Sequence, residues 1–290
     1  MFKDESLYNA ILSRRSIRRY RKQALDADTM EKIRDLAANS LPLVSDNRFE
    51  AIIRDTTDGE NLASVVGGYG RIVSPPHYLV PFVTGETHLL EELGFRLEQL
   101  AVRMTSMGIG SCYVGCIFRE QHVKSMFGLP RSARCGSLLA FGLPPDSIGG
   151  KTFNSVTRFV IRATDKLPAE RILFSESFEQ PDLPPENLKP LIEAVRLAPS
   201  AVNAQPWRFI WKDGRLHLFI KRRTAQYGSG VKQDYKYIDA GICMANISLA
   251  MEAGGIKASW RFHETSDSPA PKCLQELQPV AWIDLQELST

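Results

Sequence analysis

The amino-acid sequence predicts an α+β protein built from two diverged copies of one structural unit. Stretches in which apolar residues recur with helical spacing alternate with short apolar stretches typical of strands. Residues 90–115 match residues 237–262 at a constant offset of 147 positions, and residues 30–37 match residues 188–195 at an offset of 158. No strand-like stretch leads through a glycine-rich turn into a helix, which favours an α+β sandwich over a doubly wound sheet.

The first matched pair predicts a long helix that ends at a glycine and continues into a strand. In residues 90–115, apolar side chains recur at helical spacing as far as Met104, and a glycine follows, as is common at helix ends. The same order recurs in residues 237–262. The matched positions are Gly94 with Gly241, Met104 with Met251, Gly108 with Gly255, and Tyr113 with Trp260.

The second matched pair predicts a shorter helix in each copy, followed by a polar loop and an apolar strand, FEAII in the first copy and WRFIW in the second. The last apolar segments, SLLAFGLP and PVAWIDL, complete the parallel. Chance similarity is an alternative because helix–glycine–strand units are common, but the shared order and spacing favour a repeat. The expected junction is the polar stretch 163–186, which gives units over residues 1–165 and 166–290.

Composition and charge restrict the class of protein. With 43% hydrophobic and 24% charged residues, the chain is typical of a globular protein, and no apolar run approaches the roughly 20 residues that span a bilayer. The first residues include acids and offer no small-residue cleavage site, so we expect no signal peptide. Five cysteines, an odd number, are typical of a reducing compartment. We therefore expect a cytoplasmic protein without a membrane partner.

A basic motif, SRRSIRRY, follows the first short helix-like stretch. Arg14, Ser16 and Arg18 alternate with other residues, so an extended backbone would place them on one side. Two guanidinium groups and a hydroxyl suit a phosphate group, because arginine binds phosphate oxygens in a bidentate manner. The alternatives are a solvated basic face and a nucleic-acid-binding patch over Arg14–Lys22, although a net charge of +3 and one aromatic residue in the patch argue against nucleic acid.

A second motif, APSAVNAQPWRF, starts where Pro199 ends a predicted helix. Ser200, Asn203 and Gln205 then place hydrogen-bonding side chains on a short irregular loop. Such a loop can bind the edge of a planar heterocycle through matched donors and acceptors. The alternative is an ordinary connection between a helix and a strand, since these are common turn residues.

These two motifs, together with the helix that ends in GIGSCYVG, resemble the flavin-binding elements of the nitroreductase family. The likeness covers nearly the whole chain and is greatest to the branch in which two nitroreductase-like halves are fused. The resemblance implies a three-layer sandwich, in which a mainly antiparallel sheet is flanked by helices. It also implies an FMN between the halves, held by the basic motif of one and the loop of the other.

Each motif is complete in only one half. The first half has PLVSDNRFE where the loop would stand, and the second has RILFSESF where the basic motif would stand. We therefore expect one FMN site per chain and a monomer that acts as a pseudo-dimer. The resemblance implies that Arg14, Arg15 and Ser16 lie at the phosphate and ribityl end, with Arg158 also at the phosphate. Arg18 and Arg71 would lie near flavin N1/O2. The remaining expected contacts are Tyr113, Val114, Gly115 and Cys116 along the ring, with a backbone N–H near Gly115 directed at N5, and Pro199, Ser200, Ala201, Asn203 and Gln205 from the other half.

The implied activity is an FMN-dependent reduction of a planar nitroaromatic or quinone-type acceptor by NADH or NADPH, in ping-pong order. The flavin supplies the chemistry, so no catalytic side-chain nucleophile is expected. No metal is expected either, because Cys112, Cys116 and His122 lack the second ligand pair of a zinc site. Two alternatives remain open, a flavin-binding or degenerate protein without turnover, and the nucleic-acid-binding module described above.

Overall fold

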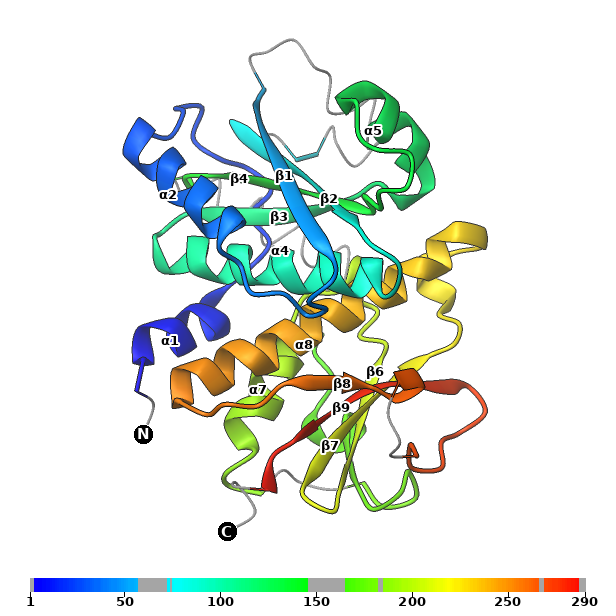
Figure 1. Cartoon of the computed structure of the whole chain (residues 1–290). Coiled ribbons are helices and arrows are strands. Elements are labelled where there is room, and N and C mark those ends of the chain that lie inside the picture. The colour runs from blue at the N-terminus through cyan, green and yellow to red at the C-terminus, as the bar shows by residue number, and fades with distance from the viewer. Residues whose placement is uncertain are drawn as a thin grey trace.

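The computed structural model describes residues 3–56, 72–73, 75–145, 165–181, 185–265 and 269–286. Two β-sheets enclose a pair of long helices that pack against each other in the middle of the molecule (Figure 1). Among the described residues, no helix combines the length and apolar character needed to cross a membrane. The α+β class expected from the sequence is confirmed.

The first sheet contains four strands in the order β1-β2-β4-β3, and all neighbours are antiparallel. The second sheet has the order β5-β6-β7-β9-β8, in which β5 is parallel to β6 and the other pairs are antiparallel. The strands are β1 (Arg48–Asp55), β2 (His77–Thr84), β3 (Gly110–Gly115), β4 (Ser137–Gly142), β5 (Leu173–Ser175), β6 (Trp207–Lys212), β7 (Arg215–Lys221), β8 (Trp260–Phe262) and β9 (Leu277–Asp284).

Helix boundaries follow local capping chemistry. Asp4 and Asp26 each accept a hydrogen bond from a backbone N–H in the first turn of the helix that follows. This N–H has no acceptor within the helix itself. The longest helix ends at Gly255, whose φ of 73° is in the left-handed region. The helices are α1 (Glu5–Ser13), α2 (Ala27–Ala38), α4 (Leu89–Ser106), α5 (Glu120–Phe127), α7 (Lys189–Leu197) and α8 (Tyr235–Gly254).

The matched segments of the sequence form matched elements. Residues 90–115 supply α4 and β3, and residues 237–262 supply α8 and β8. Likewise α2 and α7 come from the pair at the offset of 158. With β5 set aside, β6-β7-β9-β8 repeats the strand order of β1-β2-β4-β3. The two sheets therefore share one topology.

Helices α4 and α8 approach so closely that only glycine fits at two positions. A Cβ at Gly94 would overlap the backbone carbonyl oxygen of Ile238, and a Cβ at Gly241 would overlap that of Glu91. Adding 147 to Gly94 and Glu91 gives Gly241 and Ile238, so each contact maps onto the other. The two close approaches therefore involve residues at matching positions of the two helices.

The main hydrophobic core runs through both halves of the chain. It includes side chains of α4 and α8 and the inner faces of both sheets, such as Leu93, Leu139, Ile242 and Leu218. A second cluster fills the outer face of the first sheet beneath α5, and a smaller one lies on the outer face of the second sheet. Because the largest cluster spans the α4–α8 contact, the two sheets are held by one shared core.

We predict that Gly94→Ala and Gly241→Ala each destabilise the protein by about 2 kcal/mol, because the added methyl group collides with a backbone carbonyl. In an unconstrained helix the same change would stabilise by about 1 kcal/mol, so the sign itself is diagnostic. Urea unfolding measures the effect, with Ser106→Ala on the exposed end of α4 as the control. Unchanged or increased stability in both glycine variants would contradict the close approach.

Candidate functional site

The basic motif runs in extended conformation beside β3. Ser16 forms a parallel bridge with Ser111, and the Ile17 N–H donates to the Ser111 carbonyl at 2.8 Å. The alternation buries Arg14 and Arg18, which are 8% and 2% exposed. These two arginines therefore do not form a solvated basic face. Arg15 lies on the opposite, exposed side and donates a hydrogen bond to the Ser13 carbonyl.

Arg14 is paired with a carboxylate on the central helix α4. Its Nε lies 3.3 Å from Glu98 Oε1, and the Tyr113 hydroxyl donates to Glu98 Oε2 at 2.6 Å. Burial raises the pKa of Glu98, although Arg14 and the Tyr113 hydrogen bond oppose this effect. In the described part of the chain, the buried Nη1 of Arg14 has no hydrogen-bond partner. A buried guanidinium N–H without an acceptor is costly, so this atom is suited to an anionic ligand.

The loop of the second half is tight and internally bonded. Ala201–Asn203 form a 3₁₀ turn, and Val202, Asn203 and Gln205 all have positive φ. The side-chain amides of Asn203 and Gln205 donate to the Asp165 carbonyl at 3.1 and 2.9 Å. Gln205 Oε1 also accepts from the Leu167 N–H at 2.9 Å. In this arrangement both amides hold residues 165–167, whereas the sequence suggested that they bind a heterocycle.

Lys166 connects the loop to the basic motif. Its ammonium group donates to the Ala198 carbonyl at 2.7 Å, and the charges of Arg14, Glu98 and Asp239 all act on it. Burial, followed by repulsion from Arg14, lowers the pKa of Lys166 to about 7. We call Arg14, Glu98, Lys166 and Asp239 the charge cluster. It is the place where the two motifs of the sequence meet.

Asp239 anchors the loop to α8. Its carboxylate accepts from the Ala201 N–H at 3.0 and 3.1 Å and from the Tyr227 hydroxyl at 2.6 Å. Burial raises the pKa of Asp239 to about 7, and the hydrogen bonds from Tyr227 and Ala201 limit the rise. Burial therefore shifts the pKa values of Asp239 and Lys166 toward each other, to about 7, within one cluster.

The internal repeat of the sequence could have identified Asp239 as a buried carboxylate that binds the loop. The matching residue in the first half is Glu92, which accepts from the Leu43 and Val44 N–H groups at 3.0 and 2.8 Å. Leu43 matches Ala201 at the offset of 158, so both halves use a buried helix carboxylate to bind the loop backbone. Sequence reasoning also missed Glu98, Lys166 and Tyr227, for which no comparable repeat exists.

The segment expected to line the flavin ring is partly covered. A Cβ at Gly115 would overlap the Tyr235 hydroxyl, so this phenol lies against the Gly115 backbone. Val114 and Cys116 are fully buried, and the Cys116 thiol donates to the Cys135 carbonyl at 3.2 Å. Tyr113 is half-buried and directed at Glu98.

The matching position in the second half is closed by a larger residue. Phe262 corresponds to Gly115 and His88 to Tyr235 at the offset of 147. The Phe262 and His88 rings stack with centroids 3.6 Å apart and planes 9° apart. In the second half, the Phe262 side chain thus occupies the space that Gly115 leaves open in the first half.

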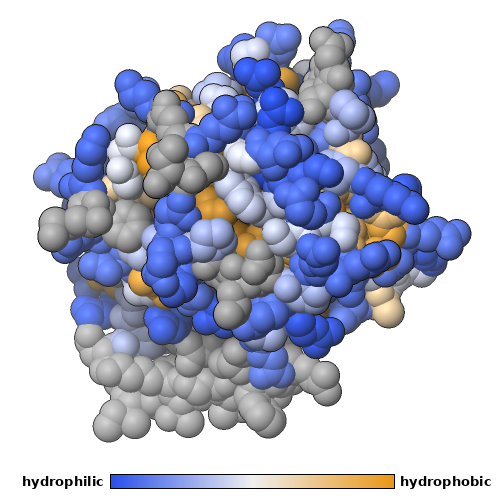
Figure 2. All heavy atoms as spheres, turned by 90° about the horizontal axis from the view of Figure 1, so that it is seen from below, coloured by the Kyte–Doolittle hydropathy of each residue, from blue (hydrophilic) through white to orange (hydrophobic). Residues whose placement is uncertain are grey.

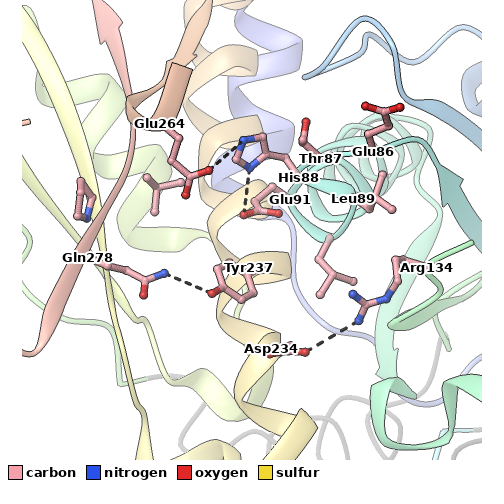
Figure 3. A pocket seen from close by; sticks show the side chains of 13 residues that line it. Glu86, Thr87, His88, Leu89, Glu91, Arg134, Asp234, Tyr237, Glu264 and Gln278 are labelled. Atoms are coloured by element: carbon pink, nitrogen blue, oxygen red, sulfur yellow. Dashed lines mark hydrogen bonds and ion pairs between the residues drawn. The ribbon is translucent and has the colours of Figure 1, made fainter. Parts of the chain in front are cut away.

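A pocket of about 400 Å³ lies between the first turns of α4 and α8 and strand β9 (Figure 3). His88 lies between Glu91 and Glu264, with nitrogen–oxygen distances of 3.7 and 4.0 Å. Across the pocket, Gln278 donates to the Tyr237 hydroxyl at 3.5 Å. The volume of this pocket is in the range of small-molecule sites. None of these lining residues was expected from the sequence.

Two expected residues, Arg71 and Arg158, lie outside the described residues. In the described ranges, no group of three or more His, Cys, Asp or Glu side chains is arranged to hold a metal ion. The expected loop residues Pro199 and Ser200 are half-buried at the end of α7, where Ser200 accepts from the Gln205 N–H at 2.9 Å.

A profile of the family described as "Putative TM nitroreductase" matches residues 6–251. The chain therefore belongs to this nitroreductase family and is a nitroreductase-family oxidoreductase. No curated protein matches it.

One solved structure shares the fold over nearly the whole chain, and others are similar to about half of it. A chain from Thermotoga maritima, described as a putative nitroreductase, is 20% identical to this chain and has a TM-score of 0.56. The match covers 97% of this chain and 94% of the Thermotoga maritima chain. Nitroreductase A from Vibrio parahaemolyticus is 21% identical over 49% of this chain and 69% of its own, with a TM-score of 0.42. The NADPH:FMN oxidoreductase from Vibrio harveyi is 18% identical over 49% and 70%, also with a TM-score of 0.42.

We predict that Asp239→Asn reduces the pH dependence of stability in the acid range. The pKa of Asp239 is about 7 in the folded chain against an ordinary 3.8, so the folded state binds the proton more tightly. The stabilisation of the folded state that comes from this tighter proton binding is fully present below about pH 4. It is lost as the pH rises through 7, and the free energy of unfolding falls by about 1.4 kcal/mol per pH unit at most. Chemical unfolding at pH 5, 6 and 7 should therefore show a shallower decline for the variant. If the free energy of unfolding changed with pH equally in the variant and the wild type, the raised pKa of Asp239 would be contradicted.

Proposed function

We propose that the chain is an FMN-dependent oxidoreductase, which takes hydride from NADH or NADPH and passes it to a planar nitroaromatic or quinone-type acceptor. Membership of the nitroreductase family supports the class of reaction. The observation that carries the proposal is the meeting of the basic motif and the second-half loop at the charge cluster, where Arg14 Nη1 is buried without an acceptor. The site would lie within a single chain.

We further propose that residues 1–165 and 166–290 are diverged copies that pair as an intrachain pseudo-dimer. Three observations support this: the shared strand order, the reciprocal contacts of Gly94 and Gly241, and the repeated contact between a buried carboxylate and a loop backbone. Phe262 in place of Gly115 gives a physical reason why only one site would remain.

The described residues fit FMN at one end. Arg14 Nη1 would donate to a phosphate oxygen, and Ser16, half-buried on the same side, would add its hydroxyl. At the other end, the Tyr235 phenol lies over the Gly115 backbone, where the resemblance places the flavin ring. The fit therefore requires Tyr235 to lie elsewhere when FMN is bound.

The chain's own residues would hold charge and protons around the cofactor. When bound, FMN accepts and donates the hydride. Arg14 and Arg18 are fixed cations in a water-poor region, and such charges stabilise negative charge that develops nearby. The Lys166 ammonium and the Asp239 carboxyl, with pKa values near 7, can hold or release a proton at neutral pH.

A second candidate is a nitroreductase-family protein that has lost turnover. Two observations favour it: Tyr235 covers Gly115, and the Asn203 and Gln205 amides are bonded to the backbone of residues 165–167. Consumption of NADH or NADPH with menadione by the FMN-loaded chain separates the candidates, because the degenerate protein would bind cofactor or ligand without turnover.

We predict that removing the Arg14 cation weakens FMN retention at least tenfold. Because Arg14→Met alone would leave Glu98 buried and unpaired, the variant combines Arg14→Met with Glu98→Gln. Retention is measured by absorbance after gel filtration, and Arg34→Ala on the exposed face of α2 is the control. Equal retention by the double variant and the control would refute the assignment of Arg14 to the phosphate.

We also predict that Tyr235→Ala changes FMN affinity, whereas Tyr237→Ala, two residues further along α8, does so much less. Only Tyr235 touches the Gly115 backbone, so only its removal opens the proposed ring position. Fluorescence titration with FMN measures both affinities. Tighter binding by the Tyr235 variant would mean that the phenol competes with the ring, and equal affinities of both variants and the wild type would exclude the ring from this position.

A further inference from the structure

The outer edge of the first sheet differs from the matching edge of the second. In the second sheet, β6 is covered by the parallel strand β5, through the pairs Leu173–Phe209 to Ser175–Trp211. In the first sheet the matching strand is β1, and among the described residues no strand pairs with its outer edge. Every side chain of β1 is at least partly exposed, whereas half of β6 is buried. Open strand edges readily pair with another chain.

The side chains of β1 are sorted between its two faces. Phe49, Ala51 and Ile53 pack against the shared core, whereas Ile52 packs against the cluster on the outer face of the sheet. Since side chains alternate along a strand, Glu50 and Arg54 lie on the same outer face as Ile52, one on each side of it. An acid, an apolar residue and a base at this spacing form a self-complementary pattern.

We propose that the chain is not the monomer expected from the sequence, and that two copies pair antiparallel through their β1 edges, around a two-fold axis at Ile52. In this register Ile52 faces Ile52 of the second copy, and Glu50 faces the second copy's Arg54 on both sides of the axis. Directly opposed side chains of opposite charge stabilise an antiparallel pair. The two first sheets then form one continuous sheet.

The charge pattern selects this register. Moving the axis to Ala51 would place Arg48 opposite Arg54, and like charges directly opposed are destabilising. Moving it to Ile53 would place Arg54 opposite Ile52 and Glu50 opposite Thr56, so no pair of opposite charges would form between the two copies at these positions. A one-residue slip in only one strand would turn its apolar side chains to the wrong face. The pairing leaves the charge cluster of each chain untouched, so it does not depend on the proposed function.

Charge reversal at the two positions tests the proposal in the full chain. Glu50→Arg and Arg54→Glu, each alone, would place like charges opposite each other on both sides of the axis. We expect each to weaken dimerisation at least tenfold, measured by sedimentation equilibrium or light scattering. Glu31→Arg, on the exposed face of α2, should dimerise as the wild type does.

Restoration makes the test specific. An equimolar mixture of the Glu50→Arg and Arg54→Glu chains should form a heterodimer, because every opposed pair then has opposite charges. The double variant should also dimerise. A monomeric wild-type chain, single variants that dimerise as the wild type does, or a mixture that stays monomeric would each overturn the proposal. Far-ultraviolet circular dichroism verifies that the variants are folded.

Discussion

The structure depends on the close crossing of α4 and α8. Gly94 and Gly241 let the backbone of each helix touch the other, and no side chain separates them. Because the helices approach there, Glu92 and Asp239, each two residues before one of these glycines, lie at the centre of the molecule, where they bind the two matching loops. The carboxylates are buried for the same reason, and burial is what raises the pKa of Asp239.

The two halves use this shared frame differently. Glu92 is neutralised by Arg96, whose Nε lies 2.6 Å away, so its role is to hold the loop. Asp239 instead accepts from Tyr227 and shares its buried surroundings with Lys166. At the matching ring positions, one half has glycine and the other has phenylalanine stacked on His88. The structural contacts are conserved between the halves, whereas the groups suited to ligand binding are concentrated on one side.

Local patterns in the sequence were sufficient for the elements but not for the charge cluster. The spacing of apolar residues and the two offsets predicted α4, α8, α2 and α7, because these signals are contained within each segment. Alternation likewise predicted a shared side for Arg14 and Arg18. Lys166 and Tyr235 could not be predicted, since their roles arise from residues far away in the chain. The hydrogen bonds of the Asn203 and Gln205 amides to the backbone of residues 165–167 could not be predicted either, because these partners lie about 40 positions away in the chain.

Under the proposed function, one chain forms one flavin site from parts of both halves. Isothermal titration calorimetry of the full chain with FMN measures the number of sites directly. We predict a stoichiometry of one FMN per chain. No binding, or two FMN per chain, would contradict it.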